Sequence, residues 1–268
     1  RPLAYVPELA APLAALAPVP DPSATVQDAP ADEAAARTAS PDTSRVSAHP
    51  GDSLRVYLLT MGQGDLVWEK FGHNAIRIVD ERDGSDLAWE WGVFDFAQEN
   101  FWPRLIRGEM LYSMAEETTE RLIYEYEYYD RSVWSQELAL TAGQKVRLRD
   151  AIRENYRPEN REYLYDYYRD NCSTRVRDML DLALGGRLRE ALTDDTTSTT
   201  YRWHTRRLLS TSPPAYTGIQ LALGNPADRP ITAWEEGFLP MRLRDHLRGL
   251  EVAGEDGRPR PLVRDERR

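Results

Sequence analysis

Residues 165–184, YDYYRDNCSTRVRDMLDLAL, contain the only cysteine of this 268-residue chain. Cys172 is preceded by Asp and Asn and followed by Ser and Thr, whereas a cysteine buried for packing usually lies among Val, Ile and Leu. From residue 172 onward the apolar residues recur with helical spacing, which predicts an amphipathic helix that begins at the cysteine. The free N–H groups and the dipole of a helix start stabilise a thiolate. The stretch indicates a nucleophilic thiol; the alternative is a core cysteine at the start of a helix.

Composition limits the classes of protein to which this chain can belong. The net charge of −10 and the absence of a basic stripe argue against binding to nucleic acid. No segment approaches 18 uncharged apolar residues, so the chain as given is not expected to span a membrane. One cysteine allows no internal disulfide, and the histidines show no metal-ligand spacing. We therefore expect neither a metal nor another cofactor.

The composition divides the chain into three parts. Residues 1–52 are rich in Ala and Pro and contain one aromatic residue, Tyr5, so they cannot bury enough apolar surface to offset the entropy of ordering. We predict a disordered linker there. Residues 53–250 are predicted to form the folded domain, since 41% of the chain is hydrophobic. Residues 251–268 are predicted to be a charged flexible tail.

Within the folded part, strand and helix patterns alternate in a way that predicts an α+β domain. The run LRVYLL from residue 54 reads as a strand, and GHNAIRIV and LAWEWGVF read as a hairpin joined by the turn at Asp83 and Gly84. A further strand is expected at residues 110–114. Residues 118–156 read as two helices, or as a strand and a helix, with Thr141 as the N-cap of the second element.

A thiol nucleophile needs a base, and the chain has four histidines. His73 is the best candidate because it starts a predicted strand directly after a glycine, which allows close approach of a substrate. His49 lies in the linker, and His246 is expected on a solvated helical face. His204 lies among aromatic residues and arginines and is ambiguous. The pattern alone leaves His73 open between a general base and a hydrogen-bonded structural histidine.

Five stretches together carry a family resemblance. In chain order they are GDLVWEKFGHNAIRIVD (64–80), WEWGVFDF (89–96), NFWPRLIRGEMLYSM (100–114), YDYYRDNCSTRVRDMLD (165–181) and GNPADRPITAWEEGFLP (224–240). They resemble successive landmarks of the family called DUF4105, or the Lnb N-terminal periplasmic domain. A single Gly-His or Asn-Cys would mean little, but five landmarks in this order are specific. The resemblance covers residues 54–245.

The resemblance implies a fold and a set of site residues. This family is similar to circularly permuted NlpC/P60 enzymes, which are papain-like: a small antiparallel sheet packs on helices, and the histidine precedes the cysteine. Cys172 would then be the nucleophile and His73 the base. Glu90 best matches the third residue that orients the imidazole, with Asp95 as the alternative. Backbone N–H groups near Cys172 would form the oxyanion hole, supported by Asn171 and Ser173.

The implied activity is cysteine-dependent acyl transfer through a thioester. Proteins called Lnb N-acylate bacterial lipoproteins, so the expected donor is a phospholipid and the expected acceptor a lipoprotein amine, with peripheral membrane contact. One alternative is an NlpC/P60-like amidase or peptidase acting on cell-wall peptides. Another is a non-enzymatic binding module of the envelope. The resemblance places the chain in the periplasm or cell envelope of a Gram-negative-type bacterium.

Overall fold

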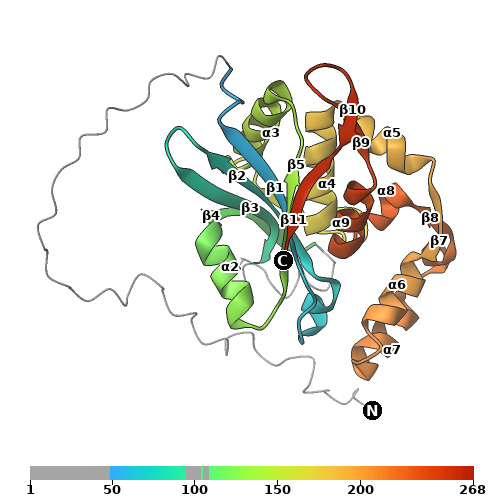
Figure 1. Ribbon diagram of the computed structural model, residues 1–268. Coiled ribbons are helices and arrows are strands. Elements are labelled where there is room, and N and C mark those ends of the chain that lie inside the picture. Colours follow the sequence, from blue (N-terminus) through green and yellow to red (C-terminus); the bar gives the residue numbers. More distant parts are fainter. Residues whose placement is uncertain (1–48, 95–103, 105–108) are drawn as a thin grey trace, which may run out of the picture. The chain divides into compact units, whose positions relative to one another are not determined.

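The computed structural model describes residues 49–94, 104 and 109–268, and its main feature is a seven-stranded sheet (Figure 1). The strands lie in the order β11-β5-β1-β2-β3-β4-β6, and every neighbouring pair is antiparallel. Their bounds are β1 (Leu54–Met61), β2 (His73–Asp80), β3 (Ser85–Phe94), β4 (Leu111–Thr118), β5 (Val133–Leu138), β6 (Glu162–Leu164) and β11 (Val263–Arg267). The prediction of an α+β class with an antiparallel sheet is confirmed.

The hairpin of β2 and β3 brings the first residue of one strand beside the end of the other. Ala75 pairs with Glu90 in the register, and the turn closes at Gly84, whose φ of +73° favours glycine. His73 therefore lies at one end of β2, a strand in the middle of the sheet. The predicted hairpin is confirmed, and the strand expected near residues 110–114 is β4.

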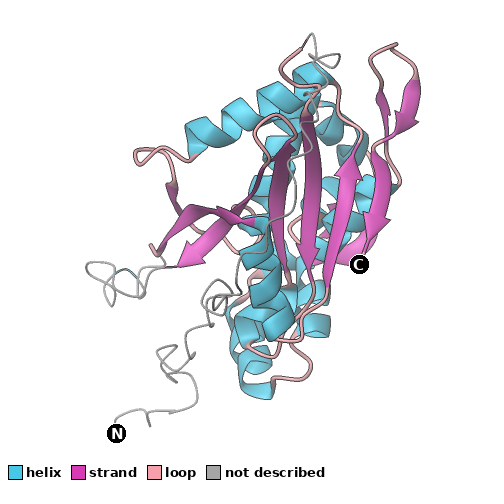
Figure 2. Ribbon diagram, turned by 60° about the vertical axis from the view of Figure 1, so that its left-hand side comes forward, coloured by secondary structure: helices cyan, strands magenta, loops and turns pink. Residues whose placement is uncertain are grey.

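Helices pack on both faces of the sheet (Figure 2). On one face lie α3 (Ala142–Asn155), α4 (Cys172–Leu184) and α9 (Pro240–Arg248), which contact β1, β2 or β3. Strand side chains alternate between faces, and the residues that meet α3 and α4 form the largest core: Val56, Leu58, Ile76, Ile78, Trp89, Trp91, Leu148, Ile152, Val176 and Leu180. The opposite residues, including Ala75 and Ala88, pack with Leu122 of α2 (Thr119–Tyr128).

Local capping explains where the two central helices begin. The Thr141 side chain accepts from the N–H of Gln144 at the start of α3, as the sequence predicts. Asn171 does the same for α4 by accepting from the N–H groups of Ser173 and Thr174. The helix that was predicted to begin at Cys172 does begin there.

The segment after α4 forms shorter elements beside the main sheet. They are α5 (Arg187–Thr193), β7 (Thr196–Thr200), α6 (Tyr201–Leu208), α7 (Pro213–Ala222), η6 (Asn225–Asp228), β8 (Pro230–Thr232), α8 (Ala233–Glu236), β9 (Glu251–Ala253) and β10 (Pro259–Pro261). A short helix, η5 (Val67–Phe71), lies between β1 and β2. None of the described helices is long and apolar enough to cross a bilayer.

The prediction of a flexible tail at residues 251–268 is wrong. These residues form β9, β10 and β11, and β11 pairs with β5 at the edge of the main sheet. Val252 and Leu262 are buried in the core, so two well-spaced apolar side chains are enough to order a charged segment. The folded domain therefore extends to the end of the chain. The linker predicted at residues 1–52 falls almost entirely outside the described residues.

Leu180 and Leu182 test the placement of α4. Leu180 is 1% exposed and Leu182 is 48% exposed on the same helix. We expect Leu180→Ala to lower the free energy of unfolding by about 2–5 kcal/mol, because it leaves a cavity. Leu182→Ala is expected to change it by about 0.5 kcal/mol or less. Urea denaturation measures both, and equal losses would contradict this packing of α4 on the sheet.

Candidate functional site

His73 and Glu90 form a hydrogen-bonded pair on neighbouring strands. His73 opens β2 after Gly72, and Glu90 lies near the end of β3. The Nε2 atom of His73 lies 2.7 Å from Oε2 of Glu90, and both side chains are about 15% exposed. Glu90 faces away from Trp89 and Trp91, which are buried in the core on the other face, as strand alternation predicts. The carboxylate is therefore placed to orient the imidazole.

Cys172 reaches this pair from the start of α4. Its side chain is only 7% exposed. Cys172 acts on the pKa of His73, which places its thiol next to the imidazole. Since Nε2 of His73 is engaged by Glu90, the nitrogen that remains for the sulfur is Nδ1. The structure thus brings Cys172, His73 and Glu90 together in a chain of polar contacts.

Gly92 allows the helix start to come this close to the sheet. A β-bulge interrupts the pairing of β3 with β4 between Trp91 and Val93, and Gly92 adopts a φ of +95° there. A Cβ atom at position 92 would lie 3.5 Å from Cβ of Cys172. Any larger side chain would point at the thiol, in a conformation that favours glycine. The sequence carried a signal for this feature, because an isolated glycine within a strand pattern indicates a bulge or a close approach.

The electrostatics of the site favour a charged imidazole. Burial alone would lower the pKa of His73. The charge and hydrogen bond of Cys172 and the hydrogen bond and charge of Glu90 outweigh burial and raise this pKa to about 10. A positively charged imidazole beside a cysteine is one of the surroundings that can stabilise a thiolate.

Asn171 and Ser173 fix the start of α4. Asn171 donates its two amide protons to the carbonyl oxygens of Tyr167 and Phe238, at 2.8 and 3.0 Å. The Ser173 hydroxyl donates to the carbonyl of Gly237, at 2.7 Å. Their side-chain donors are therefore already used within the protein, and both residues position Cys172. Asp95, the alternative to Glu90, lies outside the described residues.

Two other donors near the sulfur are free. The backbone N–H of Cys172 donates to no residue in the described part of the chain. The Tyr163 hydroxyl is buried without a partner among the described residues. It would lie 3.9 Å from a Cβ on Gly92, and the charge of Cys172 adds to burial in raising the Tyr163 pKa. The sequence analysis missed Tyr163, because the run of tyrosines before Cys172 gives no sign of which one faces the thiol.

The other three histidines lie in different surroundings. His204 and His246 both bind Glu236, with Nε2 at 2.9 and 2.8 Å from the carboxylate oxygens. The prediction of a solvated face for His246 is therefore wrong, since its side chain is 14% exposed. His49 accepts a hydrogen bond from the N–H of Gly51. No group of three or more potential metal ligands occurs among the described residues.

The fold and the site together define an α+β domain with a buried cysteine at a helix start, facing a His–Glu pair on an antiparallel sheet. The family model described as the Lnb N-terminal periplasmic domain matches residues 46–211, which is more than half of the chain. The chain belongs to this family, which confirms the resemblance and places it in the bacterial envelope, on the periplasmic side. Neither a curated protein nor a solved structure matches the chain significantly.

Glu117 on β4 is a carboxyl group that loses its proton near neutral pH, and its charge acts on Glu90 and His73. Its side chain is 19% exposed. Burial, followed by the charges of Glu90 and Glu125, raises its pKa from 4.5 to about 7. A carboxyl group whose pKa is raised by folding keeps its proton up to a higher pH in the folded protein than in the unfolded protein. Glu117 therefore destabilises the fold increasingly as the pH rises from about 4.5 to 7, and fully above that.

We expect Glu117→Gln to stabilise the protein at pH 8 by about 1 kcal/mol, after allowance for solvent screening. At pH 4 the variant and the wild type should be equally stable, because the carboxyl group is then neutral in both states. Thermal unfolding at the two pH values measures this, with the exposed Glu127→Gln as the matched control. A gain of the same size at both pH values would contradict the assignment.

Proposed function

We propose that this domain is a cysteine acyl-transfer enzyme of the envelope, with Cys172 as nucleophile, His73 as general acid and base, and Glu90 as the residue that orients His73. The observation that carries the proposal is the pairing of a buried thiol with a histidine whose pKa is raised to about 10. A structural histidine paired with Glu90 alone would lack the contribution of Cys172, which raises the His73 pKa further.

The first half of the reaction forms a thioester. The Cys172 thiolate attacks the carbonyl carbon of the donor, so a C–S bond forms and the carbonyl oxygen becomes an oxyanion. The backbone N–H of Cys172 and the hydroxyl of Tyr163 are the free donors available to bind this oxyanion. His73 then gives its Nδ1 proton to the leaving oxygen or nitrogen as the bond to carbon breaks.

The second half regenerates the enzyme. His73, now neutral, removes a proton from the acceptor, which attacks the thioester carbonyl. The C–S bond breaks, the thiolate returns and the imidazolium is restored beside it. An amine acceptor gives an N-acyltransferase, and water gives a hydrolase.

The surroundings of the thiol support transfer to an amine over hydrolysis. Cys172 is buried, and Tyr163 and Tyr165 lie beside it on the side of Gly92. Tyr126 stacks on the His73 ring, with ring centroids 6.2 Å apart. Limiting the access of water is what a thioester needs to survive until an amine arrives. We therefore propose the Lnb-like reaction, in which a phospholipid ester is the donor and the amine of a lipoprotein is the acceptor.

Thiol labelling tests the ion pair directly. Cys172 is the only cysteine, so iodoacetamide gives a single mass shift. A free thiol with a pKa of about 8.5 is ionised by less than about 1% at pH 6. We expect the wild type to react at pH 6 at least about tenfold faster than His73→Ala, because the imidazolium stabilises the thiolate. The advantage should fade as the pH rises past about 8.5, because the thiol of His73→Ala then ionises without the imidazolium. His49→Ala is the control, and a His73→Ala rate equal to that of the wild type would refute the ion pair.

The reaction itself is tested with a phospholipid that carries a labelled acyl chain and a lipidated peptide with a free α-amine. The wild type is expected to move the label to the peptide and Cys172→Ala to move none. Unchanged transfer by Cys172→Ala would refute the proposal. Release of muropeptides from peptidoglycan by a protein that transfers no acyl group would instead favour the amidase.

Tyr163→Phe tests the oxyanion donor. Loss of one such donor lowers kcat by about 100- to 1000-fold in well-studied enzymes, with little effect on KM. The fold should not suffer, because the hydroxyl that is removed has no partner among the described residues. Tyr128→Phe, at a side chain that is 52% exposed, is the matched control. An unchanged kcat in Tyr163→Phe would remove Tyr163 from the mechanism.

A further inference from the structure

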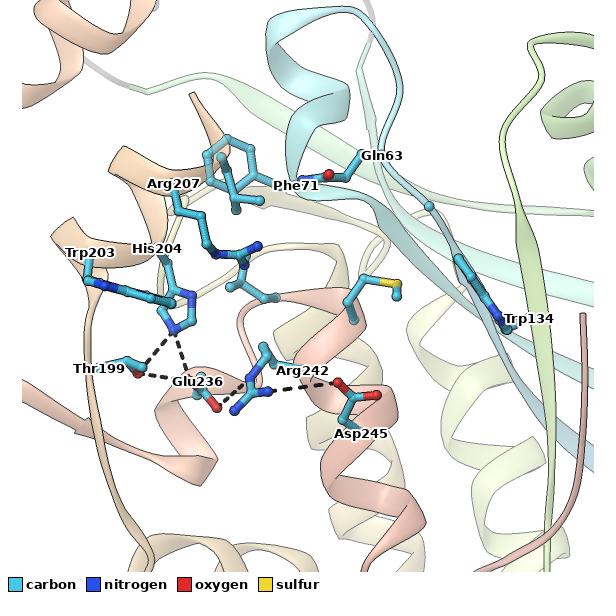
Figure 3. A pocket seen from close by; sticks show the side chains of 14 residues that line it. Gln63, Phe71, Trp134, Thr199, Trp203, His204, Arg207, Glu236, Arg242 and Asp245 are labelled. Atoms are coloured by element: carbon cyan, nitrogen blue, oxygen red, sulfur yellow. Dashed lines mark hydrogen bonds and ion pairs between the residues drawn. The ribbon is translucent and has the colours of Figure 1, made fainter. Parts of the chain in front are cut away.

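A pocket of about 490 Å³ is lined by residues other than Cys172, His73 and Glu90 (Figure 3). Its walls come from the segment between β1 and β2, from β5, β7 and α6, and from α8, α9 and the segment that joins them. Its lining includes Phe71, His204, Arg207, Glu236, Met241 and Arg242. The volume is within the range of small-molecule sites in proteins, about 300–1000 Å³.

The negative charges of this pocket are already neutralised. Glu236 is completely buried, and its carboxylate accepts from His204, His246, Arg242 and Thr199. Burial alone would raise the Glu236 pKa, but these hydrogen bonds hold it well below its usual range. Asp245, also in the lining, lies within 4 Å of three arginines. Neither carboxylate is left to repel an anion.

Two polar groups of the same pocket have neither a hydrogen bond nor an ion pair with any side chain that the structure describes: the Arg207 guanidinium and Nδ1 of His204. Arg207 forms no ion pair with any described carboxylate, and its guanidinium lies 5.5 Å from the centroid of the Trp203 ring. His204 is 1% exposed, and its Nδ1 atom is buried without a hydrogen bond in the described structure. The His204 ring is fixed from its other side, where Nε2 contacts Glu236 and Thr199 (Figure 3). A buried polar atom without a partner is uncommon and costly, which points to a ligand.

The rest of the wall is apolar. Phe71, Leu208 and Leu239 are buried side chains that face the pocket, and Met241 is half-buried beside them. Trp203 is 50% exposed next to Arg207, so a large apolar ring accompanies the free cation on α6. An apolar wall with a few convergent polar groups is typical of a small-molecule site.

We propose that this pocket binds an amphiphilic anion, that is, a carboxylate or phosphate group attached to an apolar chain. Arg207 binds the anionic group. Nδ1 of His204, which lines the same pocket, provides a second polar contact to the ligand. The apolar chain lies against Phe71, Leu239 and Met241. Fatty acids and lipid phosphate esters share this chemistry. The inference does not depend on acyl transfer at Cys172, because it rests on residues that take no part in that reaction.

Calorimetric titration of the full chain tests the pocket with four probes: octanoate, octyl phosphate, octanol and inorganic phosphate, each below its micelle concentration where it has one. Octanoate or octyl phosphate is expected to bind, and octanol and inorganic phosphate at least about tenfold more weakly. Arg207→Ala should weaken binding by about ten- to hundredfold, the usual effect of losing a charge-assisted hydrogen bond. Arg206→Ala is the matched control, because Arg206 contacts Tyr216 and does not line the pocket.

Met241→Trp provides a second measurement, since it fills the apolar part and should abolish binding while leaving Arg207 in place. Binding of inorganic phosphate as tight as that of octyl phosphate would overturn the amphiphile and leave a simple anion site. Binding unaffected by Arg207→Ala, or no binding by either amphiphile, would overturn the proposal. Preference of octanoate over octyl phosphate, or the reverse, identifies which anionic group the pocket takes. Because none of these measurements involves Cys172 chemistry, their failure is distinguishable from failure of the proposed acyl transfer.

Discussion

The position of the thiol depends on one buried side chain, Asn171. Its amide oxygen accepts from the first N–H groups of α4, and its amide nitrogen donates to the carbonyls of Tyr167 and Phe238. A buried amide with all these contacts satisfied holds the preceding loop, the distant segment around Phe238 and the start of the helix in one geometry. Cys172 follows directly, so its sulfur is placed by the cap. Ser173 adds a further contact to Gly237.

This anchoring gives a physical meaning to the landmark at residues 224–240, which lies beyond the matched family region of residues 46–211. The segment around Phe238 supplies backbone carbonyls to the start of α4. Farther along the helix, Arg177 donates to the carbonyl of Trp234 and stacks on its ring at 3.8 Å. Removing the segment would leave buried donors of α4 without acceptors, which is costly. The family core and this segment therefore form one structural unit.

The domain uses a Glu–His pair twice, with different results. Glu90 meets His73 at a partly exposed edge of the sheet, and the second nitrogen of that ring faces a thiol. Glu236 is completely buried and forms ion pairs with two histidines and an arginine. Its carboxylate thereby links α6 to α9. The same residue types thus lie beside a thiol in one place and form a buried cluster of ion pairs in the other. What differs is burial and the number of donors around the carboxylate.

The sequence by itself determined the local features: the hairpin of β2 and β3, the cap of α3, and the cysteine at the start of an amphipathic helix. These follow from turn chemistry, capping and periodicity, which act over a few residues. It also supplied the pairing of Cys172 with His73, through the resemblance. The resemblance also named Glu90, and the structure places it 2.7 Å from His73. Only the tertiary structure decided that Tyr163 lies near the thiol, that His246 is buried against Glu236 and that the last strand joins the sheet. Those outcomes depend on contacts between residues far apart in the chain, where burial and partner geometry outweigh any local preference.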